Sequence, residues 1–288
     1  MSKQGVSEHS NPALVTISKL KQTGTLRERL SDQLAIEAPL LIVVVIKQQP
    51  IELATIMRTP GDDQALALGF LLSEHIIKSA EDVSDIDVSE DNEITLTLAE
   101  HIKLAKQHAR TFTSYSGCGI CGKASIKQLA LNAQRKIDEQ TRWLDLIAVV
   151  NATNELKSRQ TLFNQTGAVH GAALVELING QVSWLACKED VGRHNAVDKI
   201  IGEHLLTAKP NKYILLLSGR ISFELVQKAV MAGISVIAAI GAPSSLALQT
   251  AQQFNLTLLG FIGNEQANIY CNEWRLTDSN LESTIEQK

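Results

Sequence analysis

The last third of the chain alternates short apolar runs with amphipathic segments, and this pattern constrains the fold more than any other feature. The runs "YILLL", "SVIAAI" and "LTLLGFIG" are nearly unbroken apolar stretches, as expected of strands covered on both faces. The segments "SFELVQKAVMAG" and "SSLALQTAQQF" lie between them and predict helices. Strands that alternate with helices predict a three-layer α/β domain with a largely parallel portion.

The segment before this alternation predicts a hairpin and a helix. "AALVELINGQVSWLAC" fits two strands joined at Asn179 and Gly180, residue types for which a positive φ costs little. "HNAVDKIIGEHLL" is amphipathic at helical spacing, with Val197, Ile200 and Leu205 on one side. These elements extend the same α/β domain toward the N-terminus.

The first half of the chain predicts a smaller α+β domain. "APLLIVVVIK" and "QQPIELATIMR" predict two strands joined by a short turn, and a helix is expected from about Asp63 to Glu74. "EITLTLAEHI", from Glu93 to Ile102, alternates as a half-buried strand does. Residues Met1 to about Lys21 are rich in Ser, Gln, Asn and Lys and have no sustained apolar period, which predicts a mobile, partly disordered arm.

We therefore divide the chain into an arm at 1–35, a small domain at 36–112, a cysteine-containing loop at 113–130 and an α/β domain at 131–288. The fold class is α/β, or α+β when both domains are considered together.

Composition excludes several classes of protein. The net charge of −4, with both signs interspersed, lacks the basic stripe that binding to nucleic acid requires. The longest apolar run, Leu40 to Ile46, is too short to cross a bilayer, and the polar first residues do not resemble a secretory signal. We therefore expect a cytoplasmic protein that binds neither nucleic acid nor a membrane.

Two of the four cysteines, Cys118 and Cys121, lie in "SYSGCGICGKAS", where glycine flanks the pair. A second thiol, exposed backbone amides and a cation such as Lys123 all lower the pKa of a thiol, so the pair fits a nucleophile with a resolving partner. The same spacing fits half of a zinc site, although Cys187 and Cys271 are isolated, or a structural role. Glycine on both sides favours thiol chemistry on a mobile loop. Zinc deaminase chemistry is excluded, because no histidine is followed two residues later by glutamate.

Two helix starts offer sites for anions. In "CKEDVGRHNAVDK", Arg193 and His194 lie at the N-terminus of the predicted helix, where free amides beside an arginine suit phosphate. In "LLLSGRISFE", Ser218, Arg220 and Ser222 follow a buried strand, which is where open α/β sheets bind ligands. Both segments also fit ordinary capped loops, and capping by Ser222 would not exclude a ligand.

Two further segments are candidates. "TGAVHGAAL" places His170 among small residues, where a lone histidine fits the core or, given the space beside glycine, a ligand. "MRTPGDD" places Arg58 and Asp62 at a helix start, as a cap or as an anion clamp. The residues alone thus indicate a dithiol loop and phosphate-binding helix starts, without naming a reaction.

Several of these blocks, in one order, resemble the FdhD family of formate dehydrogenase accessory sulfurtransferases. The similarity covers about Glu37 to Tyr270 and rests on "RTPGDDQALALGFLLSEHII", "SGCGICGKAS", "EDVGRHNAVDKIIG", "SGRISFELVQKAVMAGI" and "APSSLA". It implies a sulfurtransferase in which a cysteine desulfurase loads a persulfide on Cys118, with Cys121 as the second thiol. The sulfur then passes to molybdenum in the bis(molybdopterin guanine dinucleotide) cofactor, a bound substrate, for use by formate dehydrogenase.

The resemblance also implies a cytidine-deaminase-like fold for 131–288, without the deaminase's catalytic residues, and a homodimer. No intrinsic metal is expected. The phosphates of the molybdenum cofactor would lie at Arg193, His194, Ser218 and Arg220. An alternative is a chaperone that binds the molybdenum cofactor and whose thiols take no part.

The chain departs from the family pattern near its C-terminus. The family has a cofactor-contacting "GFxRGxR", and this chain reads "GFIGNEQ". The cofactor-binding positions are then Phe261, Ile262, Gly263, Asn264, Glu265 and Gln266. Gly263 and Gln266 replace two arginines, which should weaken binding of the cofactor unless other groups compensate.

Overall fold

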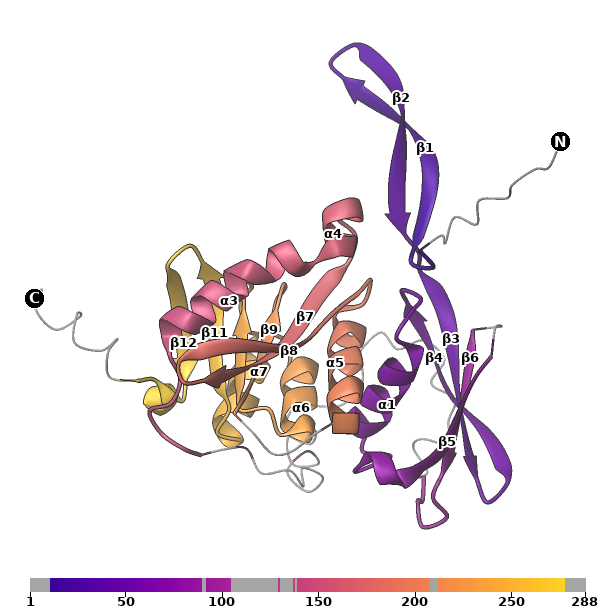
Figure 1. The fold of residues 1–288 in the computed structure, drawn as a ribbon, viewed down its shortest axis with the longest axis vertical. Helices are drawn as coiled ribbons and strands as arrows, with labels where there is room; N and C mark the ends of the chain where they lie inside the picture. The colour runs from indigo at the N-terminus through magenta and orange to yellow at the C-terminus, as the bar shows by residue number, and fades with distance from the viewer. Residues whose placement is uncertain are drawn as a thin grey trace, which may run out of the picture.

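The fold was analysed in a computed structural model, which describes residues 11–89, 92–104, 129, 137, 139–207 and 212–277. Over these residues the chain forms a six-stranded sheet, a four-stranded sheet and a separate two-stranded sheet, together with helices that cover the larger sheets (Figure 1). This mixed architecture confirms the predicted α/β and α+β fold class. The likeness to cytidine deaminases stays a prediction.

The six-stranded sheet contains the parallel portion that the apolar runs predicted. Its strands are β7 (His170–Ile178), β8 (Gln181–Asp190), β9 (Tyr213–Leu217), β10 (Val236–Ala239), β11 (Thr257–Gly263) and β12 (Gln266–Cys271), in the order β12-β11-β10-β9-β7-β8. The central strands β9, β10 and β11 are parallel, and β7 and β12 run antiparallel to them. The β7–β8 turn has a positive φ at both Asn179 and Gly180, as predicted.

Helices cover both faces of this sheet. On one face α3 (Leu146–Arg159) packs on alternate strand residues such as Val175 and Leu216, and the short α4 (Thr161–Thr166) follows it. On the other face α5 (Arg193–Thr207), α6 (Phe223–Ala232) and α7 (Ser245–Gln253) share a core with the intervening residues, Leu174 and Leu215 among them. This alternation explains why the strands are apolar throughout, because each face contacts a helix layer.

The four-stranded sheet has the order β4-β3-β6-β5, and its strands are β3 (Ala38–Ile46), β4 (Gln49–Arg58), β5 (Val83–Ser89) and β6 (Glu93–Leu98). Helix α1 (Asp63–Ser73) follows β4, as predicted, and a 3-10 turn, η1 (Ala80–Asp82), precedes β5. The predicted strand from Glu93 ends at Leu98 rather than Ile102, because the chain turns where the Ile102 amide donates to the Ala99 carbonyl.

Helices α1 and α5 pack directly against each other, between the two larger sheets (Figure 1). A Cβ on Gly69 of α1 would overlap the backbone carbonyl of Asp198 in α5. A Cβ on Gly202 of α5 would in turn overlap the carbonyl of Ala65 in α1. The two glycines therefore permit a backbone approach that any larger residue would prevent, and one continuous hydrophobic core extends from the small sheet through both helices to the large sheet.

Two buried polar clusters reinforce this contact. Lys228 Nζ of α6 lies 2.7 and 2.8 Å from the carboxylate oxygens of Asp198, which also accepts a 2.9 Å hydrogen bond from Ser73 of α1. In the second cluster Lys199 lies 2.9 Å from Asp190 and donates to the Thr59 carbonyl at 3.0 Å. Each cluster connects residues that follow β4 to the helices of the large sheet through charges that are paired and hydrogen-bonded, as buried charges must be.

The N-terminal arm differs from its prediction. Its described part contains two ten-residue strands, β1 (Leu14–Thr23) and β2 (Leu26–Ala35), which pair antiparallel in continuous register. Apolar and polar residues alternate here only loosely, and most side chains are exposed, so no clear strand period is visible in the sequence. Figure 1 shows the hairpin projecting away from the rest of the chain.

Among the described helices, none is both long and apolar enough to cross a membrane.

We expect Gly69→Ala and Gly202→Ala each to lower the free energy of unfolding by at least about 1–3 kcal/mol, because the added methyl group meets backbone of the facing helix. Urea unfolding followed by circular dichroism measures the change. Gly263→Ala is the matched control, since a Cβ there meets nothing within 4 Å. Equal stability of the three variants would contradict the close helix contact.

Candidate functional site

The predicted thiol pair, Cys118 and Cys121, lies outside the described residues, as does Lys123. The two cysteines that the structure does describe have surroundings unsuited to nucleophilic chemistry. Burial raises the pKa of the Cys187 thiol to about 11, and burial likewise raises the pKa of Cys271 to about 11. Because the thiolate is the reactive form, neither residue is a candidate nucleophile near neutral pH.

The structure brings the segments that contain His170, Arg193 and Ser218 together at one edge of the large sheet, where β9, β10 and β11 end. The loop after β9 contacts the start of β7, since the Gly171 amide donates to Ser218 Oγ at 2.9 Å and the Ser218 amide donates to the Gly171 carbonyl at 3.0 Å. The loop after β10 lies against the loop after β9, with the Gly241 amide 3.2 Å from the Gly219 carbonyl. This edge is where ligands bind in open α/β sheets, as the sequence predicted for Ser218 and its neighbours.

Gly241 is the residue that lets the loops meet. A Cβ at this position would lie 2.7 Å from both the Arg220 amide nitrogen and the Gly219 carbonyl oxygen. The Gly241 carbonyl in turn accepts a 3.2 Å hydrogen bond from the Phe261 amide, which attaches the end of β11. Sequence reasoning missed this glycine, because its close contacts arise only when three strand ends are aligned.

The N-termini of α5 and α6 contribute charged side chains to the same edge. His194 Nε2 lies 3.2 Å from Ser222 Oγ and 2.9 Å from Glu224 Oε2. The hydrogen bond from His194 holds the pKa of Glu224 below its ordinary value. Glu224 was not among the predicted site residues, although it ends the quoted "LLLSGRISFE".

His170 lies at the start of β7 beside these groups. Burial lowers the pKa of its imidazole, and the nearby charges of Arg193, His194 and Arg220 lower that pKa further. The side chain is therefore neutral near pH 7 and can donate or accept one hydrogen bond. Among the charged groups that act on this imidazole, Asp190 opposes the three cationic side chains and raises its pKa.

Arg193 and Arg220 supply positive charge at this edge. Arg220 is exposed, and Arg193 is partly buried. The Nε atom of Arg193 is buried and has no hydrogen-bond partner among the residues that the structure describes. A guanidinium with an unused donor suits a phosphate or carboxylate, which can accept two parallel hydrogen bonds.

The segment from Phe261 to Gln266 adjoins the edge but is not basic. Phe261 is 52% exposed and has a φ of 52°, at a bulge between Gly260 and Gly263 where β11 and β12 lose register. Asn264 also has a positive φ, and its carbonyl accepts a hydrogen bond of 2.6 Å from Asn154 of α3. Left-handed backbone is costly for phenylalanine, so the surrounding loops must hold this conformation.

Arg58 and Asp62 do not belong to this edge. The Arg58 guanidinium is 2% exposed and forms a bidentate pair with Asp63, at 2.8 and 2.9 Å. Asp62 pairs with Lys188 at 2.9 Å. Asp62 stands at the N-cap position of α1 but its side chain makes no capping hydrogen bond, and the side chains of Arg58 and Asp62 are both occupied by ion pairs within the chain.

The polar residues around the start of α5 fall into two groups, one in the core and one at the ligand edge. Asp190 is fully buried, and its Oδ1 atom accepts from the Gly192 amide at 2.8 Å and from Asn195 Nδ2 at 2.9 Å. Asn195 also donates to the Met57 carbonyl at 2.8 Å. From this segment Arg193 and His194 lie at the ligand edge, whereas Asp190 and Asn195 bond to Thr59 and Met57 at the end of β4. Glu189 accepts from the first amides of α4.

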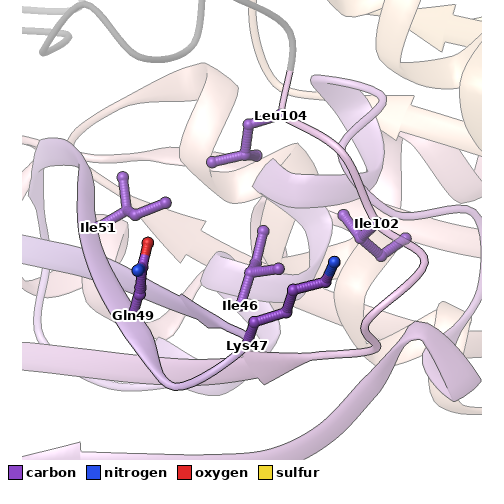
Figure 2. A pocket seen from close by; sticks show the side chains of 6 residues that line it. All are labelled: Ile46, Lys47, Gln49, Ile51, Ile102 and Leu104. Atoms are coloured by element: carbon purple, nitrogen blue, oxygen red, sulfur yellow. The ribbon is translucent and has the colours of Figure 1, made fainter.

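A separate apolar pocket lies beside the chain that leads into the cysteine segment. It has a volume of about 280 Å³, and Figure 2 shows Ile46, Ile51, Ile102 and Leu104 around it, with Lys47 at its rim. Leu104 is the last described residue before the gap that contains the two cysteines. The pocket shares no residue with the cationic edge, so these are two distinct features.

Comparison with known proteins identifies relatives over most of the chain. A model of the FdhD/NarQ family matches residues 35–277. A sulfur carrier protein FdhD of Sulfolobus acidocaldarius is 40% identical over 267 residues, which cover 91% of this chain and 97% of the relative. The sulfur carrier protein FdhD of Saccharolobus solfataricus is 39% identical over 249 residues, covering 85% of this chain and 91% of the relative. A crystal structure described as a formate dehydrogenase accessory protein of Desulfotalea psychrophila superposes with a TM-score of 0.70, at 25% identity, and covers 92% of this chain and 100% of that one.

We expect the pKa of His170 to rise in Arg193→Gln and in Arg220→Gln, because each substitution removes a positive charge that disfavours protonation of the imidazole. Titration followed by NMR of the histidine ring protons measures the pKa. Arg27→Gln, in the projecting hairpin, removes the same charge elsewhere and should leave His170 unchanged. A constant pKa in all three variants would show that the arginines do not share a site with His170.

Proposed function

Because the chain belongs to the FdhD/NarQ family, we propose that it is a sulfurtransferase that carries sulfur as a persulfide on Cys118. The donor in this proposal is a cysteine desulfurase, and the recipient is molybdenum in the bis(molybdopterin guanine dinucleotide) cofactor of formate dehydrogenase. The printed names of its relatives support the coarser part of the proposal, since they describe sulfur carriers and a formate dehydrogenase accessory protein.

The choice of Cys118 as the sulfur acceptor rests on the raised pKa values of the two cysteines that the structure describes. Burial raises the pKa of Cys187 and that of Cys271 to about 11, which removes both as acceptors of sulfur. Cys118 and Cys121 remain, and the sequence places glycine beside both. An acceptor thiol must approach two different partners in turn, and glycine lowers the cost of the backbone rearrangements that this requires.

For a single transfer, the chemistry of a thiol pair balances without an external reductant, and a reducing thiol must then reopen the Cys118–Cys121 disulfide before the next transfer. The Cys118 thiolate attacks the outer sulfur of the donor's persulfide, so that a new S–S bond forms on Cys118 and the donor leaves as a thiolate. Cys121 can then attack the inner sulfur of the Cys118 persulfide. That step forms a Cys118–Cys121 disulfide and releases the outer sulfur as sulfide, which molybdenum can accept. Two electrons pass from the two thiols to the transferred sulfur.

The cationic edge of the large sheet is the proposed binding site for the phosphates of the cofactor. Arg193 and Arg220 supply charge there, and the unused Nε donor of Arg193 suits a phosphate oxygen. The neutral His170 and the hydroxyl of Ser222 add uncharged hydrogen-bonding groups. The bulged segment from Phe261 to Gln266 adjoins this edge and contains no arginine. In this chain Arg193 and Arg220 therefore carry the positive charge of the edge.

The proposal includes a cytoplasmic location and contact with both the desulfurase and formate dehydrogenase. Few cysteines in a long chain, two of them close together, are typical of proteins in a reducing compartment. A homodimer is the proposed assembly, and no intrinsic metal is needed for the sulfur step.

We expect the wild-type protein, incubated with a cysteine desulfurase and cysteine, to gain the mass of one sulfur, about 32 Da, in a form that a reductant removes. Cys118→Ala should abolish the gain, because it removes the acceptor. Cys187→Ala is the matched control and should gain sulfur normally, since that thiol is partly buried and its pKa is raised to about 11. Intact-protein mass spectrometry measures all three. No gain in the wild type, together with normal formate dehydrogenase maturation by a Cys118, Cys121 double variant, would favour a chaperone that only binds the cofactor.

We expect guanosine diphosphate, which represents the nucleotide portion of the cofactor, to bind about tenfold more weakly to Arg220→Gln, because a charge-assisted hydrogen bond to phosphate is lost. Isothermal titration calorimetry measures the affinity. Lys47→Gln removes the same charge from an exposed turn of the small sheet and should bind as the wild type does. Equal affinities for both variants would place the nucleotide elsewhere.

A further inference from the structure

The four-stranded sheet has one face that the described helices leave uncovered. Alternate residues of its strand β3, namely Leu40, Ile42 and Val44, belong to the hydrophobic core that includes α1. The residues between them belong to no hydrophobic cluster of the described chain: Leu41, Val43 and Val45. In Figure 1 α1 lies on one side of this sheet and no labelled helix lies on the other. We call the uncovered side the outer face of the small sheet.

Strand β3 is apolar on both sides, although the described chain covers only one. Strands of a sheet that faces water on one side usually alternate apolar with polar residues, and unbroken apolar strands are typical of sheets covered on both faces. The neighbouring strand β6 does alternate, and it places Thr95 and Thr97 on the outer face beside Val43 and Val45. The outer face therefore has an apolar centre that a partner could cover.

Acidic residues border this apolar centre on both edges of the sheet. The register pairs Glu52 of β4 with Val43, and Asp87 of β5 with Thr95, and residues directly opposite each other share a face. Both of these acids are exposed. The acids of the outer face are Glu52, Asp85, Asp87 and Glu93.

These negative charges have no counterpart on the same face. None of the four acids forms an ion pair with another described residue. Among the described residues of β3, β4, β5 and β6 that share the outer face, none is a lysine or an arginine. The face would repel an acidic surface, and a second copy of itself placed face to face, because like charges would meet. It is complementary to a basic surface, and such attraction speeds association.

We propose that the outer face of the small sheet is the docking surface for the cysteine desulfurase, which presents lysine or arginine around an apolar contact. This inference rests on the proposed function. The large sheet, with the proposed cofactor site, lies beyond α1 and α5 from this face, so the donor and the cofactor do not compete for one surface (Figure 1).

The connectivity of the chain is compatible with a donor at this face. Strand β6 belongs to the small sheet and leads, by way of Leu104, toward Cys118. A fully extended chain from Leu104 to Cys118 spans at most about 50 Å. The covalent connection therefore allows the thiol to reach a protein that is docked on this sheet.

The size of the outer face predicts a transient complex. Four strands are about 19 Å wide and the six residues of β6 about 20 Å long, so the face measures about 380 Å². Met57, which is 49% exposed, and Pro39 extend it along β4 and β3. A stable complex typically buries about 800 Å² per partner, and transient encounters bury less. A donor that must leave after each transfer fits a surface of this size.

The first test measures the rate of sulfur loading on Cys118 at increasing concentrations of the cysteine desulfurase. Glu52→Lys and Asp87→Lys should each raise the desulfurase concentration that gives half of the maximal rate about tenfold, because each replaces an attraction with a repulsion. The maximal rate should change little. Glu28→Lys is the matched control, since it makes the same change of charge at an exposed strand position of the projecting hairpin, and it should load as the wild type does.

The second test replaces the desulfurase with glutathione persulfide, a donor too small to need a docking surface. The Cys118 thiolate attacks the outer sulfur, a new S–S bond forms on Cys118, and glutathione leaves as a thiolate. Glu52→Lys and Asp87→Lys should both load from this donor at the wild-type rate, which also shows that they fold. Normal loading from the small donor with weakened loading from the desulfurase is the result that supports docking.

Three results would overturn the docking proposal and leave the proposed function intact. The first is an equal dependence on desulfurase concentration in the wild type and in both charge variants. The second is slower loading of the variants from glutathione persulfide, which would show that the face acts on the chain's own thiol. The third is a changed dimer dissociation constant in sedimentation velocity, which would assign the face to a contact between copies. A wild-type protein that loads from neither donor would instead overturn the proposed function, and the docking proposal with it.

Discussion

The backbone contact between α1 and α5 is the constraint on which the rest of the structure depends. Gly69 and Gly202 each face a carbonyl of the opposite helix, and this proximity leaves no room for a side chain. Around the contact, Asp190 and Asp198 are buried with lysine partners that come from α5 and α6. Removing one member of such a pair would leave an uncompensated charge in the core, so these pairs fix the arrangement more than they add to its stability.

This arrangement determines where the candidate site can form. Because α5 is held against α1 at its middle, its N-terminus is directed to the edge where β9, β10 and β11 end. The same edge receives the N-terminus of α6 and the loop that Gly241 allows to approach Arg220. The arginines, His170 and the His194–Glu224 pair therefore lie together as a consequence of the core. A ligand bound there would contact a preformed, cationic surface.

The segment that contains Cys118 and Cys121 lies outside the described residues, whereas the chain on either side of it is part of the described fold. The described chain leaves the small sheet at Leu104 and is described continuously again from 139, where Leu144 bridges to Leu276 beside the 3-10 turn η2 (Glu273–Arg275). Both flanks thus belong to the same well-packed body.

The sequence by itself determined the parallel strands of the large sheet with the helices between them, and the β3–β4 hairpin followed by α1, because these follow from local periodicity. The ligand edge stays a prediction, made from the rule that strand ends gather ligands. Only the tertiary structure decided the role of each polar side chain. Arg58 and Asp190 resemble ligand-binding residues in the sequence, yet both are satisfied internally by partners that folding brings close, and Thr59 reaches Asp190 across 131 positions. The hairpin at 14–35 was missed for the related reason that its apolar residues are exposed and leave no clear period. The spacing of apolar residues along a segment indicates which of its faces is buried. Which partner a side chain contacts depends on residues that are distant in the chain.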